Sequence, residues 1–370
     1  QGMIRQREFN MAELEYFIDP EAPLDHDLSP WNDRPFNLVP DTQGPTPDPS
    51  HKTIADAVAS GVVRHASVGL FMALTHDFLV AVGCDPERIR FRQHEGDEMA
   101  HYASDCWDCE LHGAYGWIEA VGIAHRGCYD LEAHEQATGS RELRAWREFD
   151  EPRTVVKDVL APVGGMIGPA FRDRASQVNE ALAALEQLPE SLPFELTLGG
   201  GEVVTIEENM VEARRVEEVA RGEWFLPHVI EPAFGIDRII WHILDHAHEE
   251  TEKEGEPYVI LHLAEGVAPY DVSVLPLFEK DGMGEMARAL HQRILGIRGI
   301  QSQYDASQSI GRRYARADEI GTPWAVTVDH TSLENGTVTV RRRDDQQQIR
   351  IGQDDLCEHL TRGSVSSLFS

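Results

Sequence analysis

The hydrophobic positions of the chain follow a helical period most clearly between residues 54 and 83. Apolar side chains recur there at roughly helical spacing, at Val58, Val62, Leu70, Leu74 and Phe78. A glycine and a proline then end the run, so the pattern predicts a helical layer that stops near position 83. Upstream, residues 2–18 are predicted to form a strand that leads into a helix, and the proline-rich run 20–49 is predicted to break regular structure.

Shorter runs with a two-residue period predict strands. Residues 89–91 and 117–122 have this character. Because side chains alternate along a strand, the second run places Trp117, Glu119 and Val121 on one face of a sheet.

A second helical pattern and a second alternating pattern follow. Residues 168–188 have helical spacing, and residues 194–210 alternate around three glycines at 199–201. We therefore expect a helix and then a hairpin in a peripheral part of the fold.

Strand and helix patterns alternate regularly in the last third of the chain. Residues 231–235 form a predicted turn, and residues 236–246 form a strongly apolar helix. The patterns that follow predict strand 272–277, helix 284–295, strand 300–304, helix 310–317, strand 324–328 and strand 337–341. Such alternation predicts a separate α/β domain from about residue 265 to the end.

The length of the chain, 370 residues with 41% hydrophobic content, is sufficient for two or three domains. The most apolar stretch contains charged residues such as Asp56, Arg64 and Asp77, so we predict no membrane span. The chain begins with Gln1 and no signal segment follows, so we expect an N-terminally incomplete protein that is not exported. Five irregularly spaced cysteines do not make a disulfide framework, which fits a location in the reducing cytoplasm.

The net charge of −31 opposes a nucleic-acid partner, because binding a polyanion normally needs a basic surface. Lysine occurs at only four positions, 52, 157, 253 and 280, so nearly all the positive charge is arginine. This pattern is typical of a surface adapted to molar salt, where the Debye length falls to about 3 Å and repulsion is screened. We interpret the protein as halophilic. The alternative is an ordinary acidic enzyme with a small-molecule substrate.

Three residues near the start are spaced four apart: Arg5, Phe9 and Glu13. If they converge on one pocket, the guanidinium can clamp a phosphate and the ring can stack on a purine. A surface arginine with Phe9 in the core is the simpler explanation of the spacing alone.

A tight turn precedes the apolar helix. Pro232 and Gly235 fix the turn, and Asp237 suits the start of a helix. Arg238 does not, because the helix dipole disfavours a cation in the first turn by about 0.3–1 kcal/mol. A bound phosphate would explain the arginine, and so would a salt bridge to Asp237 or Glu231.

Glu119 lies on an otherwise apolar strand. A buried carboxylate there must be paired or must bind a metal. Magnesium held together with ATP phosphates would satisfy it, and a structural salt bridge would do so equally well.

Three other patterns are interpreted as structural. Cys106 and Cys109 have CxxC spacing, but no second pair follows at the spacing of a zinc site. His242, His246 and His248 indicate a packed or solvated helix face. The triple glycine lacks the lysine and the helix of a phosphate loop.

Taken together, these segments resemble the class II aminoacyl-tRNA synthetases, and specifically the dimeric glycyl-tRNA synthetase family of archaea and eukaryotes. Residues 2–13 resemble the second half of motif 2, and residues 231–238 resemble motif 3. The stretch 90–131, with RFRQH, DEMAHYA, DCWD, GWIEAVGIAHR and YDL, resembles the part that distinguishes glycyl enzymes from other members of the class. Residues 268–343 contain segments similar to the family's anticodon-binding domain.

The resemblance implies a role for each matching residue. The residues implied to bind ATP are Arg5, Gln6, Phe9, Glu119, Ala120 and Arg238, with Arg238 and Glu119 acting in catalysis and Glu119 binding Mg²⁺. The residues implied to bind glycine are Glu13, Glu231, Pro232 and Ala233. The implied partners are glycine, ATP, the glycine tRNA and, in the full-length protein, a second copy of the chain in a homodimer.

The implied fold class is α/β (α+β). An antiparallel-sheet catalytic core would occupy residues 1–264, with insertions at about 41–95 and 152–225, and a mixed-sheet anticodon-binding domain would occupy residues 265–370. Ala233 stands where the family usually has serine, and motif 1 would precede the first residue. The alternative functions are a non-catalytic tRNA-binding or accessory protein and a class II ligase for serine or proline.

Overall fold

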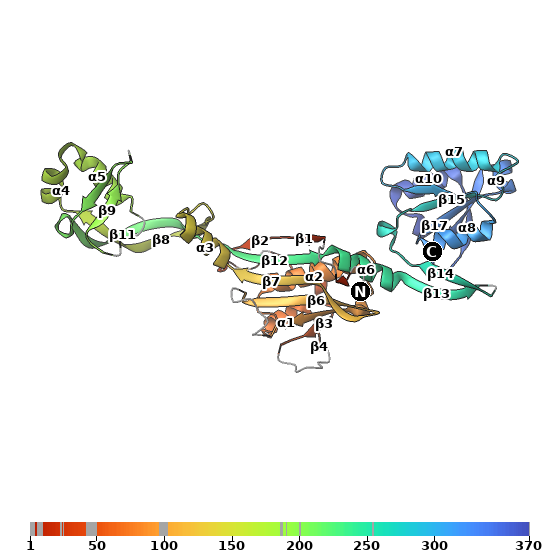
Figure 1. Cartoon of the computed structure of the whole chain (residues 1–370), viewed down its shortest axis with the longest axis horizontal. Coiled ribbons are helices and arrows are strands. Elements are labelled where there is room, and N and C mark those ends of the chain that lie inside the picture. Colours follow the sequence, from red (N-terminus) through yellow and green to blue (C-terminus); the bar gives the residue numbers. More distant parts are fainter. Residues whose placement is uncertain are drawn as a thin grey trace. The chain divides into compact units, whose positions relative to one another are not determined.

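Strand β12, His228–Gly235, lies inside the largest sheet of the chain (Figure 1). The computed structural model describes residues 4–5, 10–22, 24, 26–41, 50–95, 103–185, 188–189, 191–199, 201–253 and 255–369. Within these residues the sheet has eight strands in the order β1-β12-β7-β6-β5-β3-β4, and β2 also pairs with β12. The other strands are β1 Met11–Glu13, β2 Tyr16–Ile18, β3 Phe36–Val39, β4 Ser50–Lys52, β5 Ile89–Gln93, β6 Asp105–Gly113 and β7 Gly116–Gly127. All paired strands are antiparallel except β3 and β5.

The hydrophobic core of this sheet lies on one face only. Two helices, α1 Ile54–Ala59 and α2 Ala66–Ala81, pack there against buried strand residues such as Phe91, Trp107 and Ile123. Alternation along each strand sends these side chains to the core and their sequence neighbours to the opposite face. The opposite face is therefore free for polar residues.

The predicted helix from residue 54 onward consists of two helices. The first begins at Thr53, whose hydroxyl accepts a hydrogen bond from the Asp56 amide at 3.1 Å. It ends before Gly61, which takes φ +72°, a conformation that side chains rarely adopt. The second helix ends just before Gly83, as predicted.

The prediction that residues 2–18 enter a helix is wrong within the described residues. Met11–Glu13 and Tyr16–Ile18 are short strands that pair with β12. The local preference of residues 11–18 for a helix is outweighed by pairing with the distant strand β12. In the sheet, the backbone N–H and C=O groups of this segment find hydrogen-bond partners on β12.

A second, five-stranded sheet forms near the C-terminus, with the order β16-β15-β17-β18-β19. Its strands are β15 Val272–Pro276, β16 Ser302–Tyr304, β17 Trp324–Val328, β18 Thr337–Arg342 and β19 Gln348–Gly352, and its helices are α7 Met283–Leu295, α8 Ile310–Glu319, α9 His330–Asn335 and α10 Gln353–Arg362. Strands β16, β15 and β17 are parallel, and the last two are antiparallel. Figure 1 shows α7 and α8 on opposite sides of the sheet. The chain passes from β15 to β16 through α7 and then back across β15 to β17 through α8, and right-handed connections in opposite directions place their helices on opposite faces. Each of the four strands and two helices predicted for this part is confirmed, and α9, β19 and α10 are additional elements that were not predicted.

Helix α6, Ile236–Ala247, follows β12 directly, and the hairpin β13 His248–Lys253 and β14 Glu256–Leu261 follows α6. Arg341 and Asp318 form a buried ion pair at 2.8 Å. The hydroxyl of Tyr258 on β14 donates to the Asp318 carboxylate, which connects the hairpin to this ion pair. Short 3-10 turns complete the chain: η2 Ser29–Trp31, η3 Pro86–Arg88, η4 Arg172–Arg174, η5 Glu208–Met210, η6 Glu265–Val267 and η7 Val365–Phe369.

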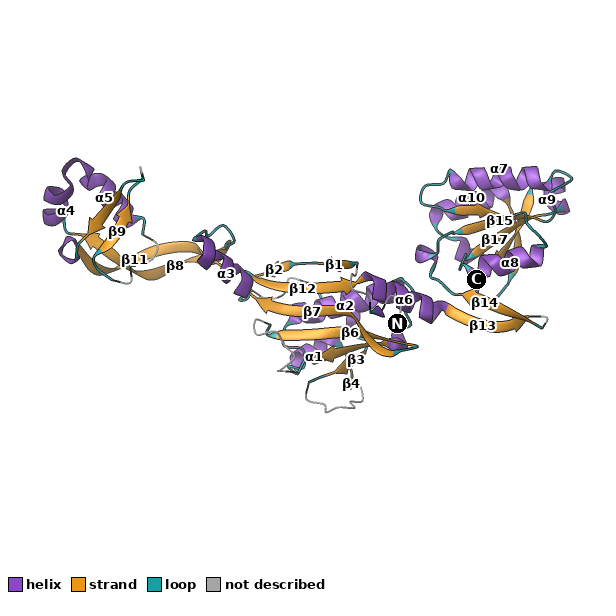
Figure 2. Cartoon of the chain, in the orientation of Figure 1, coloured by secondary structure: helices purple, strands orange, loops and turns teal. Residues whose placement is uncertain are grey.

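Residues 130–227 form a compact unit of their own, and residues 1–129 together with 228–370 form the other. The smaller unit contains a long antiparallel ribbon of β8 Ala145–Pro162 and β11 Val211–Phe225 (Figure 2). Its remaining elements are α3 Tyr129–Thr138, which begins in the other unit, α4 Gly164–Phe171, α5 Ala175–Ala183, β9 Phe194–Thr197 and β10 Val203–Ile206. The predicted hairpin at 194–210 is confirmed. The predicted helix at 168–188 is wrong as a single helix, because the chain turns at Arg172, which has φ +48°.

The predicted fold class is confirmed: an antiparallel-rich sheet with helices is followed by a mixed α/β sheet. The predicted domain boundaries at 264 and 265, and those of the two insertions, stay predictions.

Candidate active site

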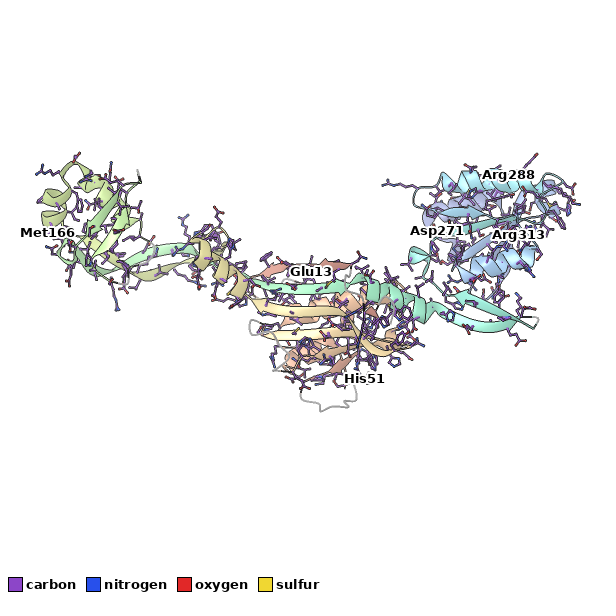
Figure 3. All side chains as sticks on the ribbon, in the orientation of Figure 1. Glu13, His51, Met166, Asp271, Arg288 and Arg313 are labelled. Carbon is purple, nitrogen blue, oxygen red and sulfur yellow. The ribbon has the colours of Figure 1, made fainter. Side chains whose placement is uncertain are left out.

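Two rows of side chains cross the polar face of the eight-stranded sheet. Residues directly opposite each other on antiparallel strands share a face, so the strand register defines each row. The first row comprises Glu13, Ala233, Gly122 and Asp108, and the second comprises Glu231, Ala124 and Cys106. Figure 3 labels Glu13 on the edge strand of this sheet. The rows bring carboxylates and very small residues together on one surface.

Arg238 joins the start of α6 to strand β7. Its Nη1 donates to the backbone carbonyl of Glu119 at 2.7 Å and lies 3.4 Å from the Glu119 carboxylate. Its Nε donates to the carbonyl of Ile4 at 3.4 Å. A salt bridge was one explanation for this arginine, but the partner is Glu119 and not Asp237 or Glu231.

Glu119 itself is not buried. Its side chain is 51% exposed, so the premise of a costly buried carboxylate is wrong. A register shift between β6 and β7 at this position turns Ala120 into the core, where it is 3% exposed, and leaves Glu119 outside. The carboxylate therefore remains accessible beside a guanidinium.

Asp237 is held by Asn10 from the start of β1. The Asn10 amide donates to one carboxylate oxygen at 2.9 Å and its side-chain nitrogen to the other at 3.1 Å. These two hydrogen bonds lower the pKa of Asp237. The contact fixes the chain just before β1 to the helix that carries Arg238.

The four residues predicted to bind glycine differ in orientation. Glu13 and Ala233 are directly opposite each other, and Glu231 lies two residues from Ala233 on the same face. Glu231 pairs with Arg126 at 2.5 Å. Pro232 alternates to the other face and is buried, and its backbone carbonyl accepts from the Leu14 amide at 3.0 Å.

The residues predicted to bind ATP near the start are described only in part. Arg5 is exposed and follows Ile4, the residue that accepts from Arg238. Gln6 and Phe9 lie outside the described residues.

Sequence reasoning missed a network of charged residues on the same face. Arg90 pairs with Glu110 at 2.6 Å and stacks on the ring of Trp117, with 4.2 Å between the guanidinium carbon and the ring centroid. Arg92 lies 3.1 Å from Asp108 and 3.3 Å from Glu110. The arginines are two residues apart on β5 and the acids are two residues apart on β6, a spacing that puts each pair on one face of a strand. This spacing was the sequence signal that could have predicted the network.

His94 extends this network at the end of β5. Its Nε2 lies 2.8 Å from Oδ1 of Asp108. The hydrogen bond to Asp108 and a further one to the Cys106 thiol raise the pKa of His94 to about 10.

The CxxC pair and two of the helix histidines have defined surroundings. Cys109 is fully buried on the core face, three residues along the strand from Cys106, so the two thiols point to opposite faces. His242 and His246 are hydrogen-bonded to the backbone carbonyls of Arg238 at 2.7 Å and His112 at 2.9 Å.

Residues 271–362 match a family model described as an anticodon binding domain. Along 99% of its length, the chain is 42% identical to a glycine–tRNA ligase of Methanothrix thermoacetophila. It is 39% identical to a glycine–tRNA ligase of Methanocaldococcus jannaschii over 97% of its length, and 38% identical to one of Bombyx mori over 96%.

The chain is homologous to the glycine–tRNA ligases. It spans 64% of the length of the two archaeal relatives and 49% of the Bombyx mori protein. The predicted resemblance is thereby confirmed over nearly the whole chain, and its C-terminal sheet coincides with the matched anticodon-binding region. None of the helices in the described part has the length and apolar character that crossing a membrane requires.

Proposed function

We propose that this chain contains the catalytic face and the anticodon-binding domain of a glycine–tRNA ligase that works in the cytoplasm as a homodimer. The observation that carries the proposal is the identity of about 40% to glycine–tRNA ligases over nearly the whole chain. The polar sheet face supports it, because the carboxylates and small residues that match the family's motifs lie together there.

The reaction has two steps. The glycine carboxylate attacks the α-phosphorus of ATP, the bond to pyrophosphate breaks, and glycyl-adenylate forms. A terminal ribose hydroxyl of the tRNA then attacks the glycyl carbonyl, and AMP leaves. Both steps depend on positioning and charge stabilisation and require no nucleophilic side chain.

The proposed ATP site consists of Arg5, Gln6, Phe9, Glu119, Ala120 and Arg238, with Ala120 contributing through its backbone because its side chain lies in the core. In this assignment Arg238 stabilises charge on the phosphates, and its pairing with Glu119 keeps its Nη1 at the polar face before ATP binds. Arg5 directly follows Ile4, whose carbonyl accepts from Arg238, and this neighbourhood supports assigning it as a second cation for the phosphates.

A magnesium ion fits beside Glu119. Mg²⁺ is usually held by one or two protein carboxylates together with substrate phosphates, and the Glu119 carboxylate is half exposed. When bound, the ion supplies positive charge to the phosphate oxygens. Glu119 is the residue that would hold it.

The glycine site consists of Glu13, Glu231 and the residues between them. The two carboxylates bind the ammonium group, and the ion pair with Arg126 orients Glu231. Ala233 and Gly122 provide room for a molecule with no side chain. Pro232 holds the strand in place through its backbone.

The decisive test is glycine-dependent exchange of pyrophosphate into ATP by the full-length gene product in molar KCl, the condition suited to a halophilic surface. We expect exchange with glycine and not with alanine, serine or proline. Absence of exchange by a folded protein that binds tRNA would contradict the proposal and favour a non-catalytic tRNA-binding protein.

A further inference from the structure

Three residues with metal-binding side chains converge at the β5–β6 edge of the polar sheet face. One ligand atom from each of His94, Cys106 and Asp108 lies within 4.8 Å of the other two. Cys106 and Asp108 are two residues apart on β6, so their side chains point to the same face. It is the only such group among the residues that the structure describes.

The backbone holds these residues in place. The amide of His94 donates to the carbonyl of Cys106 at 3.0 Å, which continues the β5–β6 pairing by one residue. The Asp108 side chain is further fixed by Arg92, at 3.1 Å from the carboxylate oxygen that does not contact His94. A neighbour that orients a ligand in this way is a regular feature of metal sites in proteins.

The spacing of the three groups suits a small ion. Zinc binds sulfur at about 2.3 Å and histidine nitrogen at about 2.0–2.1 Å, so two ligand atoms of one tetrahedral ion lie about 3.6 Å apart. The three ligand atoms here lie within 4.8 Å of one another, so they need to close by about 1 Å at most. The contact of 2.8 Å between His94 and Asp108 needs to open by about 0.6 Å to reach the same tetrahedral geometry.

We propose that His94, Cys106 and Asp108 bind a zinc-type divalent ion. A thiolate and an imidazole favour zinc over magnesium or calcium, which prefer oxygen ligands. The charges are balanced, because one thiolate and one carboxylate neutralise the ion while the imidazole binds as the neutral ring.

The site has access to solvent, with 23% of the His94 side chain and 7% of the Asp108 side chain exposed. Three protein ligands leave the fourth tetrahedral position to water or to a small ligand, as in zinc sites that are not purely structural. Asp108 belongs to the row that contains Glu13 and Gly122, so this position opens on the face assigned to glycine.

Cobalt substitution tests the site directly. Co²⁺ is titrated into the metal-free, full-length gene product, and the visible and near-ultraviolet spectrum is recorded. We expect intense bands of a tetrahedral ion with a sulfur-to-cobalt charge-transfer band at one equivalent, displaced by Zn²⁺. Cys106→Ser must abolish the charge-transfer band, and Asp108→Asn must weaken Zn²⁺ binding at least about tenfold.

A matched control separates this site from non-specific thiol binding. Cys128 forms no disulfide and directly follows β7, and Cys128→Ser must leave the bands unchanged. Far-ultraviolet circular dichroism shows whether each variant is folded. Absence of a saturable cobalt spectrum in the folded wild type, or its persistence in Cys106→Ser, overturns the proposal. Metal binding does not depend on aminoacylation, so a negative pyrophosphate exchange leaves this result standing.

Discussion

Arg238 on α6 and Glu119 on β7 are joined twice, by a hydrogen bond of 2.7 Å to the backbone carbonyl and by a contact of 3.4 Å to the carboxylate. The backbone contact fixes the guanidinium at a helix start that disfavours a cation. The carboxylate contact is partly exposed and can be exchanged for a stronger anion. Under the proposed assignment, this arrangement holds the arginine ready for phosphate, and phosphate binding breaks one weak ion pair.

Replacement of Arg238 by alanine is expected to lower glycine-dependent pyrophosphate exchange about a hundredfold or more, as removal of a preorganised charge-stabilising donor does. The measurement is the exchange rate at saturating glycine and ATP. Arg215→Ala is the control, because Arg215 is 81% exposed in the smaller unit and pairs only across the ribbon with Asp158 at 3.1 Å. Equal rates for the two variants would remove Arg238 from the ATP site.

Replacement of Gly122 by alanine is expected to raise the KM for glycine about tenfold or more, because a methyl group would enter the surface between Ala233 and Asp108. The fold is expected to tolerate it, since the added carbon would meet only Oε1 of Glu119 at 3.9 Å. Steady-state kinetics and a thermal melt measure the two effects. Gly311→Ala, on the exposed side of α8 with nothing within 4 Å, should change neither. An unchanged KM in Gly122→Ala would exclude this position from the glycine pocket.

Asp318→Ala is expected to reduce the free energy of unfolding by about 3–5 kcal/mol, because it leaves the buried guanidinium of Arg341 without its partner. Denaturant titration of the C-terminal sheet, followed by tryptophan fluorescence, measures the change. The comparison variant is Glu358→Ala, which removes an exposed pair with Arg362 and should cost less than about 1 kcal/mol. Similar losses of unfolding free energy in both variants would show that the buried ion pair stabilises the fold no more than the exposed one.

His125 is expected to make stability depend on pH. Burial, with the neighbouring His65 and His228, lowers the pKa of His125 to about 4 in the folded chain, below its ordinary value of 6.5. The folded state therefore binds fewer protons than the unfolded state between these values, and stability falls as the pH drops from about 6.5 towards 4. Chemical denaturation at several pH values measures the slope.

The variant that tests this dependence is His125→Gln, which removes the titrating ring and should flatten part of the slope between pH 6.5 and 4. His134→Gln, at an exposed position of α3, is the control and should leave the slope as it is. A wild-type slope in His125→Gln would assign the pH dependence to other groups.

Local patterns predicted four of the five strands of the C-terminal sheet and helices α7 and α8, but not β19, α9 or α10. Its strands and helices alternate in short, strongly periodic segments, and the helix after Gly235 begins and ends close to the predicted residues. Periodicity over ten residues reports which side of an element is buried, so it predicts elements whose neighbours are close in the chain. The same information failed at residues 11–18, where pairing with β12 determines the structure.

By itself, the sequence determined four of the five strands of the C-terminal sheet with helices α7 and α8, the residues that carry the family's motifs and the acidic character of the surface. Only the tertiary structure decided which of those residues face one another. The partner of Arg238, the exposure of Glu119 and the convergence of His94 with Cys106 and Asp108 all depend on strand register across the sheet. Register is set by residues far apart in the chain, and a shift of one position sends every side chain to the opposite face.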